Sequence, residues 1–273
     1  MKHRLNSWLV NGSLWLFALL TAFPLVWMVS VSFMQTGEAG AYPPPLFPQS
    51  PTLTQYESLF ERMEMGRYFL NSFLLATSIT LLSLLLNAMA GYAFAKLPFS
   101  GKERLFKTLL AALVIPAQVA MLPLFLMMKY LGLVNTYLGV MIPGMASIFG
   151  IFLVRQYALS VPNELIEAAR IDGAGEFRTF WSVIIPLLRP ILVTLALFTF
   201  MGTWNDFMWP LILMTDAQNY TLPVALAALS REHVQDNEMM MAGAVMTVLP
   251  VLIVFLVLQK QYIKGIMMGG VKG

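Results

Sequence analysis

The sequence of 273 residues contains no cysteine, only two histidines and few charged side chains. The absence of cysteine excludes disulfides, thiolate nucleophiles and cysteine-ligated metal sites. His3 and His233 lie far apart along the chain, so we predict no histidine-based metal site. Charged residues make up 11% of the chain, against about 25% in soluble domains, so we do not expect a fold surrounded by water.

Hydrophobic residues, by contrast, make up 58% of the chain, and the mean hydropathy is +0.72. A water-soluble fold of this length cannot bury so much apolar surface, whereas a lipid bilayer accepts it. The composition therefore predicts an integral membrane protein.

Long apolar runs recur along the chain, at residues 13–33, 68–95, 106–128, 137–157, 187–214 and 239–258. Each is close to or above the roughly 20 residues that a helix needs to cross a bilayer. The short alternating segments typical of membrane β-barrels do not occur. We predict an all-α, polytopic membrane protein with six transmembrane helices, forming a single transmembrane domain over residues 1–273.

The first apolar run has a second possible interpretation. Lys2 and Arg4 precede it, and the segment 39–41 resembles a signal-peptide cleavage site. The run is longer than the roughly 7–15 residues of a signal-peptide core, which favours a retained span.

The distribution of positive charge predicts the orientation. Thirteen of the 17 lysines and arginines lie at the two ends of the chain and in the loops 96–107 and 155–189. Positive charge accumulates on the cytoplasmic side, so we predict that both termini and these loops are cytoplasmic. The loops 34–67, 129–136 and 215–238 would face outward.

The loop at residues 158–186 is too elaborate for a simple connection. A cluster of residues favours a helix start, namely Ser160, Pro162 and Asn163. Glu164 and Glu167 follow in the first turns, where the helix dipole favours acids. Gly173 and Gly175 permit a sharp turn at the end of this helix. We predict a short helix, a glycine elbow and a second short helix on the membrane surface.

The same loop carries a specific motif. Glu167-Ala168-Ala169 is followed by Asp172-Gly173-Ala174 and, eight residues later, by Val183-Ile184-Ile185-Pro186. This pattern resembles the EAA motif of the permease subunits of binding-protein-dependent ABC importers. Further segments resemble the maltose-type, six-span sugar permeases, at 91–95, 115–118, 131–136, 204–210 and 264–273. The resemblance extends from residue 68 to the C-terminus, although Asp206 stands where the family often has glutamate.

The resemblance implies roles for three groups of residues. Coupling to an ATPase is implied for Glu164, Glu167, Ala168, Ala169, Asp172, Gly173, Ala174 and Pro186. A place in the translocation pathway is implied for Trp204, Asn205, Asp206 and Trp209. Contact with a binding protein is implied for Asn219, Tyr220 and Gln235. The tryptophans have an alternative role as aromatic anchors at the membrane interface, which we favour.

The resemblance also implies an assembly in the bacterial inner membrane. It would contain a second, non-identical permease subunit, two cytoplasmic ATPase subunits and an extracytoplasmic sugar-binding protein. The cargo would be a disaccharide or oligosaccharide such as maltose. The sequence has no GxxxxGK[ST] phosphate loop, so we expect no cofactor on this chain, with ATP and Mg²⁺ held by the partner ATPase.

Two other classes of membrane protein are less consistent with the sequence. An ion-driven transporter keeps ionisable residues near the bilayer midplane, and here only Asp206 lies clearly within a span. An intramembrane enzyme needs a nucleophile–base pair or a metal cluster at membrane depth, and neither occurs in the sequence. We therefore predict a non-catalytic transporter subunit.

Overall fold

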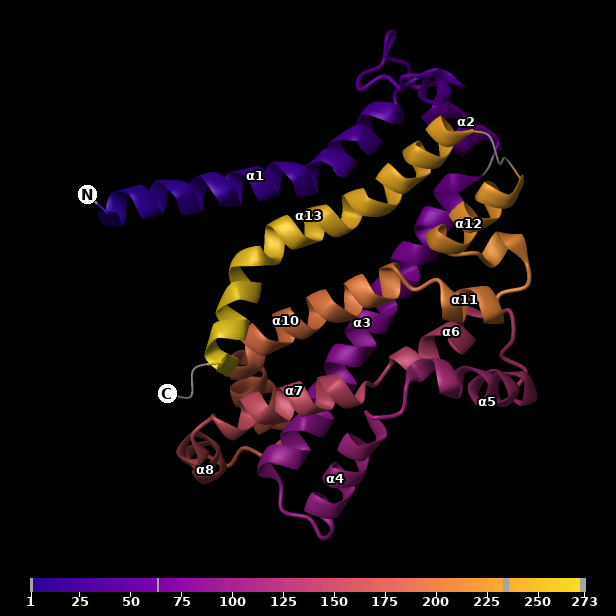
Figure 1. Cartoon of the computed structure of the whole chain (residues 1–273). Helices are drawn as coiled ribbons and strands as arrows, with labels where there is room; N and C mark the ends of the chain where they lie inside the picture. Colours follow the sequence, from indigo (N-terminus) through magenta and orange to yellow (C-terminus); the bar gives the residue numbers. More distant parts are fainter. Residues whose placement is uncertain (1, 63, 233–235, 271–273) are drawn as a thin grey trace. The chain divides into compact units, whose positions relative to one another are not determined.

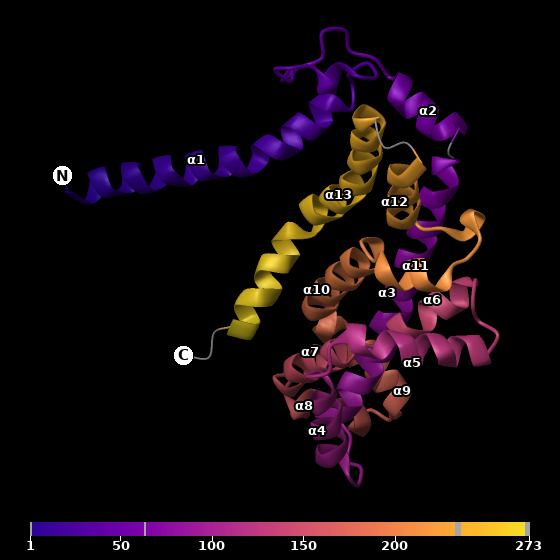
Figure 2. The same ribbon diagram turned by 45° about the vertical axis from the view of Figure 1, so that its right-hand side comes forward.

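The computed structural model describes residues 2–62, 64–232 and 236–270, and every regular element in these ranges is helical. Figures 1 and 2 show the helices in two views. The α-helices are α1 (Lys2–Val31), α2 (Thr54–Arg62), α3 (Met65–Lys96), α4 (Lys102–Ala112), α5 (Ala117–Tyr130), α6 (Tyr137–Gly144), α7 (Ile148–Leu159), α8 (Asn163–Ile171), α9 (Glu176–Thr179), α10 (Ile185–Trp204), α11 (Met208–Leu213), α12 (Leu222–Glu232) and α13 (Asn237–Gly270). Three short elements complete the set, namely η1 (Glu38–Gly40), the π-helix η2 (Phe180–Ile184) and η3 (Ala217–Asn219). The prediction of an all-α fold is confirmed for the described residues.

Four helical segments are long and apolar enough to cross a membrane, at Val10–Val31, Met65–Lys96, Glu176–Trp204 and Asn237–Gln259. Two bent pairs of helices meet the same criterion only when each pair is counted as one span. The described residues therefore contain four to six candidate spans, which overlap all six predicted runs.

The predicted span 106–128 is not a single helix. It is divided between α4 and α5, whose axes differ by 103°. Pro116 precedes α5 in an extended conformation (φ −61°, ψ 133°) and cannot donate a backbone hydrogen bond. The backbone N–H groups of Val114 and Ile115 instead bond three residues back, which tightens the end of α4 into a turn. Pro116 thus marks a sharp corner inside the predicted run.

The predicted span 137–157 is bent more gently, by 40° between α6 and α7. Ser147 begins α7, and its side chain accepts a hydrogen bond from the N–H of Gly150. A buried amide on α3 contacts the same break, because Asn87 Oδ1 accepts a hydrogen bond from the N–H of Ser147 at 3.0 Å. A polar contact inside an apolar region therefore fixes the position of the bend.

The chain forms two compact units, which we describe separately. The first comprises residues 1–67 and 225–250, as far as they are described. In it, the polar segment after α1 folds back on the end of that helix: Ser30 Oγ donates to Leu46 O at 2.6 Å, and Tyr56 Oη to Ser32 Oγ at 2.8 Å. The buried Glu238, at the start of α13, accepts a hydrogen bond from the N–H of Ala39.

The second unit comprises residues 68–224 and 251–273, as far as they are described, and it contains both candidate sites. Its largest buried cluster joins α3, α7, α8, η2 and α10, through Ala88, Tyr92, Val154, Ala158, Val161, Ile166, Phe180, Ile184, Leu188, Ile191 and Leu195. Gly91 lets α3 approach α7 closely, since a Cβ at that position would lie 2.6 Å from the side chain of Val154. In Figures 1 and 2, α8 lies at the end of this unit where α3 ends and α4 begins.

Candidate functional site

The short helix α8 ends in a well-defined glycine cap. Gly173 has a φ of +80°, in the left-handed region that favours glycine. The N–H of Gly173 bonds to Arg170 O at 3.0 Å, and the N–H of Ala174 bonds to Ala169 O at 2.9 Å. This pair of bonds is the Schellman motif, which satisfies the last carbonyl groups of a helix and reverses the chain. The elbow predicted between α8 and α9 is present.

The surface of α8 has two different faces. Ile166 is buried in the core of the unit, whereas Glu164, Glu167 and Ala168 are exposed. Ala169 and Ala174 are half-buried and Asp172 is exposed, so the predicted coupling residues other than Pro186 form one contiguous loop surface. Small side chains next to acids are suited to a close and directed protein contact.

Two exposed apolar residues on this loop were missed by the sequence analysis. Ile171 is 86% exposed and Phe177 is 75% exposed, at the end of α8 and on α9. They are the most exposed large apolar side chains of the loop 158–186. Both lie close to the glycine elbow, on either side of it, and this position could have identified them from the sequence.

Pro186 does not belong to the same surface. It lies in the first turn of α10, beyond the π-helix, and lines a groove with Leu84 and Arg189. The π-helix is closed by a bond from the N–H of Ile185 to Phe180 O, five residues back. Proline cannot donate the next bond of a regular α-helix, so Pro186 is placed where the helical pattern changes.

Side chains of α3 contact the start of α8 directly and its end through Glu176 of α9. Lys96 Nζ donates to Val161 O at 2.6 Å and to Asn163 Oδ1 at 2.7 Å, just before and at the start of α8. At the other end, Arg170 forms an ion pair with Glu176 at 2.7 Å. Tyr92 Oη donates to the second oxygen of the Glu176 carboxylate at 3.2 Å.

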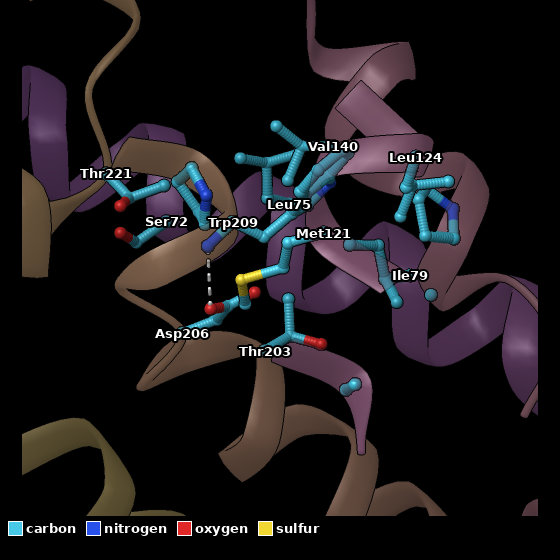
Figure 3. A pocket seen from close by; sticks show the side chains of 14 residues that line it. Ser72, Leu75, Ile79, Met121, Leu124, Val140, Thr203, Asp206, Trp209 and Thr221 are labelled. Carbon is cyan, nitrogen blue, oxygen red and sulfur yellow. Dashed lines mark hydrogen bonds between the residues drawn. The ribbon is translucent and has the colours of Figure 1, made fainter. Parts of the chain in front are cut away.

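A second candidate site surrounds Asp206, in the break between α10 and α11. A cavity of about 320 Å³ lies there, lined by α3, α5, α6, α10, α11 and the residue before α12. Figure 3 shows Asp206 in this lining, with a hydrogen bond that joins it to the backbone of Trp209. Most of the lining is apolar, and Asp206, Thr203, Ser72 and Thr221 supply its polar side chains. Such a cavity offers apolar walls and a few hydrogen-bonding groups to a small polar ligand.

Asp206 also has a structural contact. Its Oδ1 accepts a hydrogen bond from the N–H of Trp209 at 3.3 Å, which caps the first turn of α11. This contact leaves the carboxylate in the cavity lining, where a second hydrogen-bond donor can reach it.

The other predicted pathway residues occupy different environments. Trp204 is 1% exposed and packs against Phe69 and Phe200, with ring centroids 5.4 and 5.8 Å apart. Trp209 is buried, donates from Nε1 to Gly139 O at 3.3 Å and lines the cavity. Asn205 is exposed and donates to Met201 O. Neither tryptophan is an exposed interface anchor in this chain, and only Asp206 and Trp209 of the four contact the cavity.

The predicted binding-protein contact residues lie in a segment held by hydrogen bonds within the chain. Asn219 is half-buried and donates to both oxygens of Asn135, at 3.3 and 3.2 Å. Tyr220 is half-buried, and its backbone oxygen accepts a bond from Asn71. Asn135, which the sequence analysis missed, has a φ of +61° and also accepts bonds from the N–H groups of Thr215 and Asp216. Gln235 lies outside the described residues.

Among the residues that the structure describes, no three histidine or acidic side chains lie together as metal ligands would.

Comparison with known proteins places these features in a family. Residues 87–266 match the family described as the binding-protein-dependent transport system inner membrane component. The chain is 37% identical over 270 residues to the arabinooligosaccharides transport system permease protein AraQ of Halalkalibacterium halodurans, covering 98% of this chain and 97% of the relative. It is 34% identical over 250 residues to the diacetylchitobiose uptake system permease protein NgcG of Streptomyces coelicolor, covering 90% of this chain and 82% of that relative.

The fold is also shared with a solved structure. A chain of a bacterial ABC transporter involved in the import of the acidic polysaccharide alginate superposes with a TM-score of 0.85, covering 95% of this chain and 97% of that one. The sequence identity is 24%, so this likeness concerns the fold alone. With a family match over residues 87–266 and permease relatives aligned along almost its whole length, the chain belongs to the inner membrane components of binding-protein-dependent transport systems, as a non-catalytic permease subunit.

Proposed function

We propose that this chain is a pathway-forming permease subunit of an ATP-driven importer for oligosaccharides. The relatives named for arabinooligosaccharides and diacetylchitobiose support the substrate class. They differ in the sugar they carry, so the proposal extends to short oligosaccharides as a class and is not restricted to maltose. The proposed mechanism rests on one observation. The short capped helix α8 exposes acids and alanine beside a glycine elbow.

The exposed surface of α8 and the elbow form the proposed docking site for an ATPase subunit. Glu164, Glu167 and Asp172 would pair with basic residues of the ATPase, and Ala168 would let the two backbones approach closely. Ile171 and Phe177 would add apolar contact at the same interface. Closure of two ATPase subunits around ATP and Mg²⁺ would then move α8 as a rigid body.

The cavity around Asp206 is the proposed part of the translocation pathway. Its volume of about 320 Å³ lies at the lower end of the range of small-molecule sites. The carboxylate and nearby hydroxyl groups would exchange hydrogen bonds with sugar hydroxyls, and the apolar walls would contact the sugar's C–H faces. The contact would be transient, because a transported sugar must also leave.

The proposed assembly follows the predicted orientation. Both termini and the α8 loop face the cytoplasm, six spans cross the inner membrane, and residues 1–273 act as one transmembrane domain. A second, non-identical permease completes the pathway, two ATPase subunits bind from inside, and a sugar-binding protein delivers cargo to the outer side. The family's description as binding-protein-dependent supports the last of these partners.

The test is uptake of labelled short oligosaccharides into proteoliposomes that contain the reconstituted complex. We expect uptake to require ATP and the binding protein and to continue when the proton gradient is collapsed. We expect Glu167→Lys to abolish ATPase co-purification and uptake, while charge reversal of the exposed Glu57 on α2 leaves both unchanged. Uptake driven by a proton gradient without ATP, or full ATPase retention and uptake by Glu167→Lys, would disprove the proposal.

A further inference from the structure

We infer that α3 is the element that carries a displacement of α8 to the cavity around Asp206, with Lys96 and Tyr92 as positioning residues. The inference rests on the proposed function, in which α8 is the helix moved by the ATPase. It concerns the next step, namely which transmembrane element follows α8.

Two ties, each a set of hydrogen bonds, link α8 to α3. The first tie holds the beginning of α8. Lys96, the last residue of α3, donates to Val161 O and Asn163 Oδ1 at 2.6 and 2.7 Å. A cation beside a helix N-terminus is opposed by the helix dipole, so this contact is not explained as stabilisation of α8 by charge. It joins the end of α3 to the first residue of α8.

The second tie fixes the far end of α8. Arg170, in the last turn, donates from two nitrogens to Oε1 of Glu176, at 3.0 and 2.7 Å. The other carboxylate oxygen accepts from Tyr92 Oη of α3. Glu176 thus joins α8 to α3, and since Arg170 and Glu176 are about half exposed, we assign the tie a positioning role and not a large stabilising one.

Apolar packing lies between the two ties. Ile166 of α8 is buried in the same cluster as Tyr92, and the ring of Tyr92 lies 5.6 Å from that of Phe180. The helix is therefore held to α3 at its start, at its end and along its buried face. A side chain on a close-packed face cannot slide without repacking, so α8 and α3 move together.

The opposite half of α3 lines the cavity. Ser72, Leu75 and Ile79 are part of its wall, together with Asp206 and Trp209. Leu75 and Trp209 belong to one buried cluster, and Figure 3 shows both in the cavity lining. Between the two sites, α3 is one helix of 32 residues without proline. A route through α10 crosses a π-helix and contains Pro190, and a route through α7 and α6 crosses a bend of 40°, so both are less rigid connections.

The test uses the double variant Tyr92→Phe with Lys96→Met in the complete reconstituted complex. Both changes keep most of the side-chain volume and remove only the bonds to α8 and Glu176. Two matched controls are available in the same region. Tyr157→Phe alters a tyrosine that packs on the same core, and Lys102→Met removes a lysine that bonds Ala95 O and Leu97 O at the end of α3.

We expect the double variant to retain the ATPase subunits and their basal hydrolysis, while the amount of sugar imported per ATP falls about tenfold, the scale of a lost hydrogen bond to a charged group. The controls should import normally. A merely structural role would lower retention of the ATPase and leave the sugar-to-ATP ratio unchanged, and that result would overturn the inference. An unchanged ratio with the ATPase retained would overturn it as well.

A distance measurement tests the shared movement directly. The chain has no cysteine, so spin labels can be placed on Leu165→Cys in α8 and Leu81→Cys in α3, both exposed, in a complex whose other subunits lack reactive cysteines. We expect the label separation to stay constant between the ATP-bound and nucleotide-free complexes, and to vary in the double variant. A separation that changes with nucleotide in the otherwise unaltered chain would overturn the inference while leaving ATPase docking, and so the proposed function, intact.

Discussion

Asn87 Oδ1 accepts a hydrogen bond of 3.0 Å from the backbone N–H of Ser147, and this bond joins the middle of α3 to the break between α6 and α7. The Asn87 amide is completely buried, and its nitrogen donates to Ser83 Oγ at 2.7 Å. Gly150 allows the close approach, because a Cβ there would lie 2.5 Å from Asn87 Nδ2. A bent span therefore depends on one polar side chain of a neighbouring helix.

Replacing Asn87 should loosen this bend. We expect Asn87→Leu to lower the stability of the chain by about 1–3 kcal/mol, because the half-buried N–H of Ser147 loses its partner. Thermal unfolding in detergent measures the effect. The control is Thr108→Ala, which removes an exposed bond within α4 and should change little. Equal unfolding temperatures for Asn87→Leu and the unaltered chain would show that the bend does not need the amide.

The two glycines of the elbow provide a matched pair for the coupling loop. A Cβ would meet no atom within 4 Å at either Gly173 or Gly175, but only Gly173 has a positive φ. A side chain at Gly173 costs roughly 1–2 kcal/mol of backbone strain, so we expect Gly173→Val to weaken ATPase retention and transport. Gly175→Val should retain far more of both, and Gly173→Asn should recover part of the loss, because asparagine tolerates this conformation. Similar losses at both glycines would argue against a conformational requirement at Gly173.

The helical membrane fold and the elbow could be predicted from the sequence because their signals are local. Long apolar runs specify spans, and an acid-rich helix start followed by glycine specifies α8 and its cap. The corner before α5 depends on how Pro116 is accommodated, which an apolar run alone does not reveal. No local pattern distinguishes Pro116, which ends one helix before the next, from Pro123, which lies inside α5.

The contacts that define the cavity could not be predicted, because they join residues far apart in the sequence. As tryptophans near the end of an apolar run, Trp204 and Trp209 are consistent with anchors at the membrane interface. In the structure, both side chains are buried. Asn135 lies in the segment 131–136 that resembles the family, but its structural role follows from bonds to the segment 213–219, about 80 positions away. Long-range pairing of this kind leaves no periodic signal.

The bonds of Asn135 show which residues of the loop 215–238 are available for the predicted contact with a binding protein. The side chain of Asn219 is hydrogen-bonded to Asn135, whereas its neighbour Gln218 is exposed. If this loop contacts the binding protein as proposed, a crosslinker on Gln218→Cys should capture that protein more efficiently than one on Asn219→Cys. Labels on the exposed Tyr130, at the end of α5, provide a comparison for nonspecific capture. Capture from Gln218→Cys no greater than from Tyr130→Cys would place the binding protein elsewhere.

Asp206 combines two roles that a pair of substitutions can separate. Its carboxylate caps α11 through the N–H of Trp209 and also lines the cavity. Asp206→Leu removes the cap and the charge, so we expect a stability loss of about 1 kcal/mol together with strongly reduced oligosaccharide uptake, while the chain still inserts into the membrane. Asp206→Asn keeps a capping oxygen and removes only the charge. We expect it to restore stability but not uptake, because the neutral amide is a weaker acceptor for sugar hydroxyls.

Thr136→Ala is the control, since it removes the bond from the N–H of Gly139 that caps α6 and leaves the carboxylate in place. Its uptake per folded molecule should match that of the unaltered chain. Full uptake by Asp206→Asn would mean that Asp206 is a helix cap only, and that its charge has no part in the passage of the sugar.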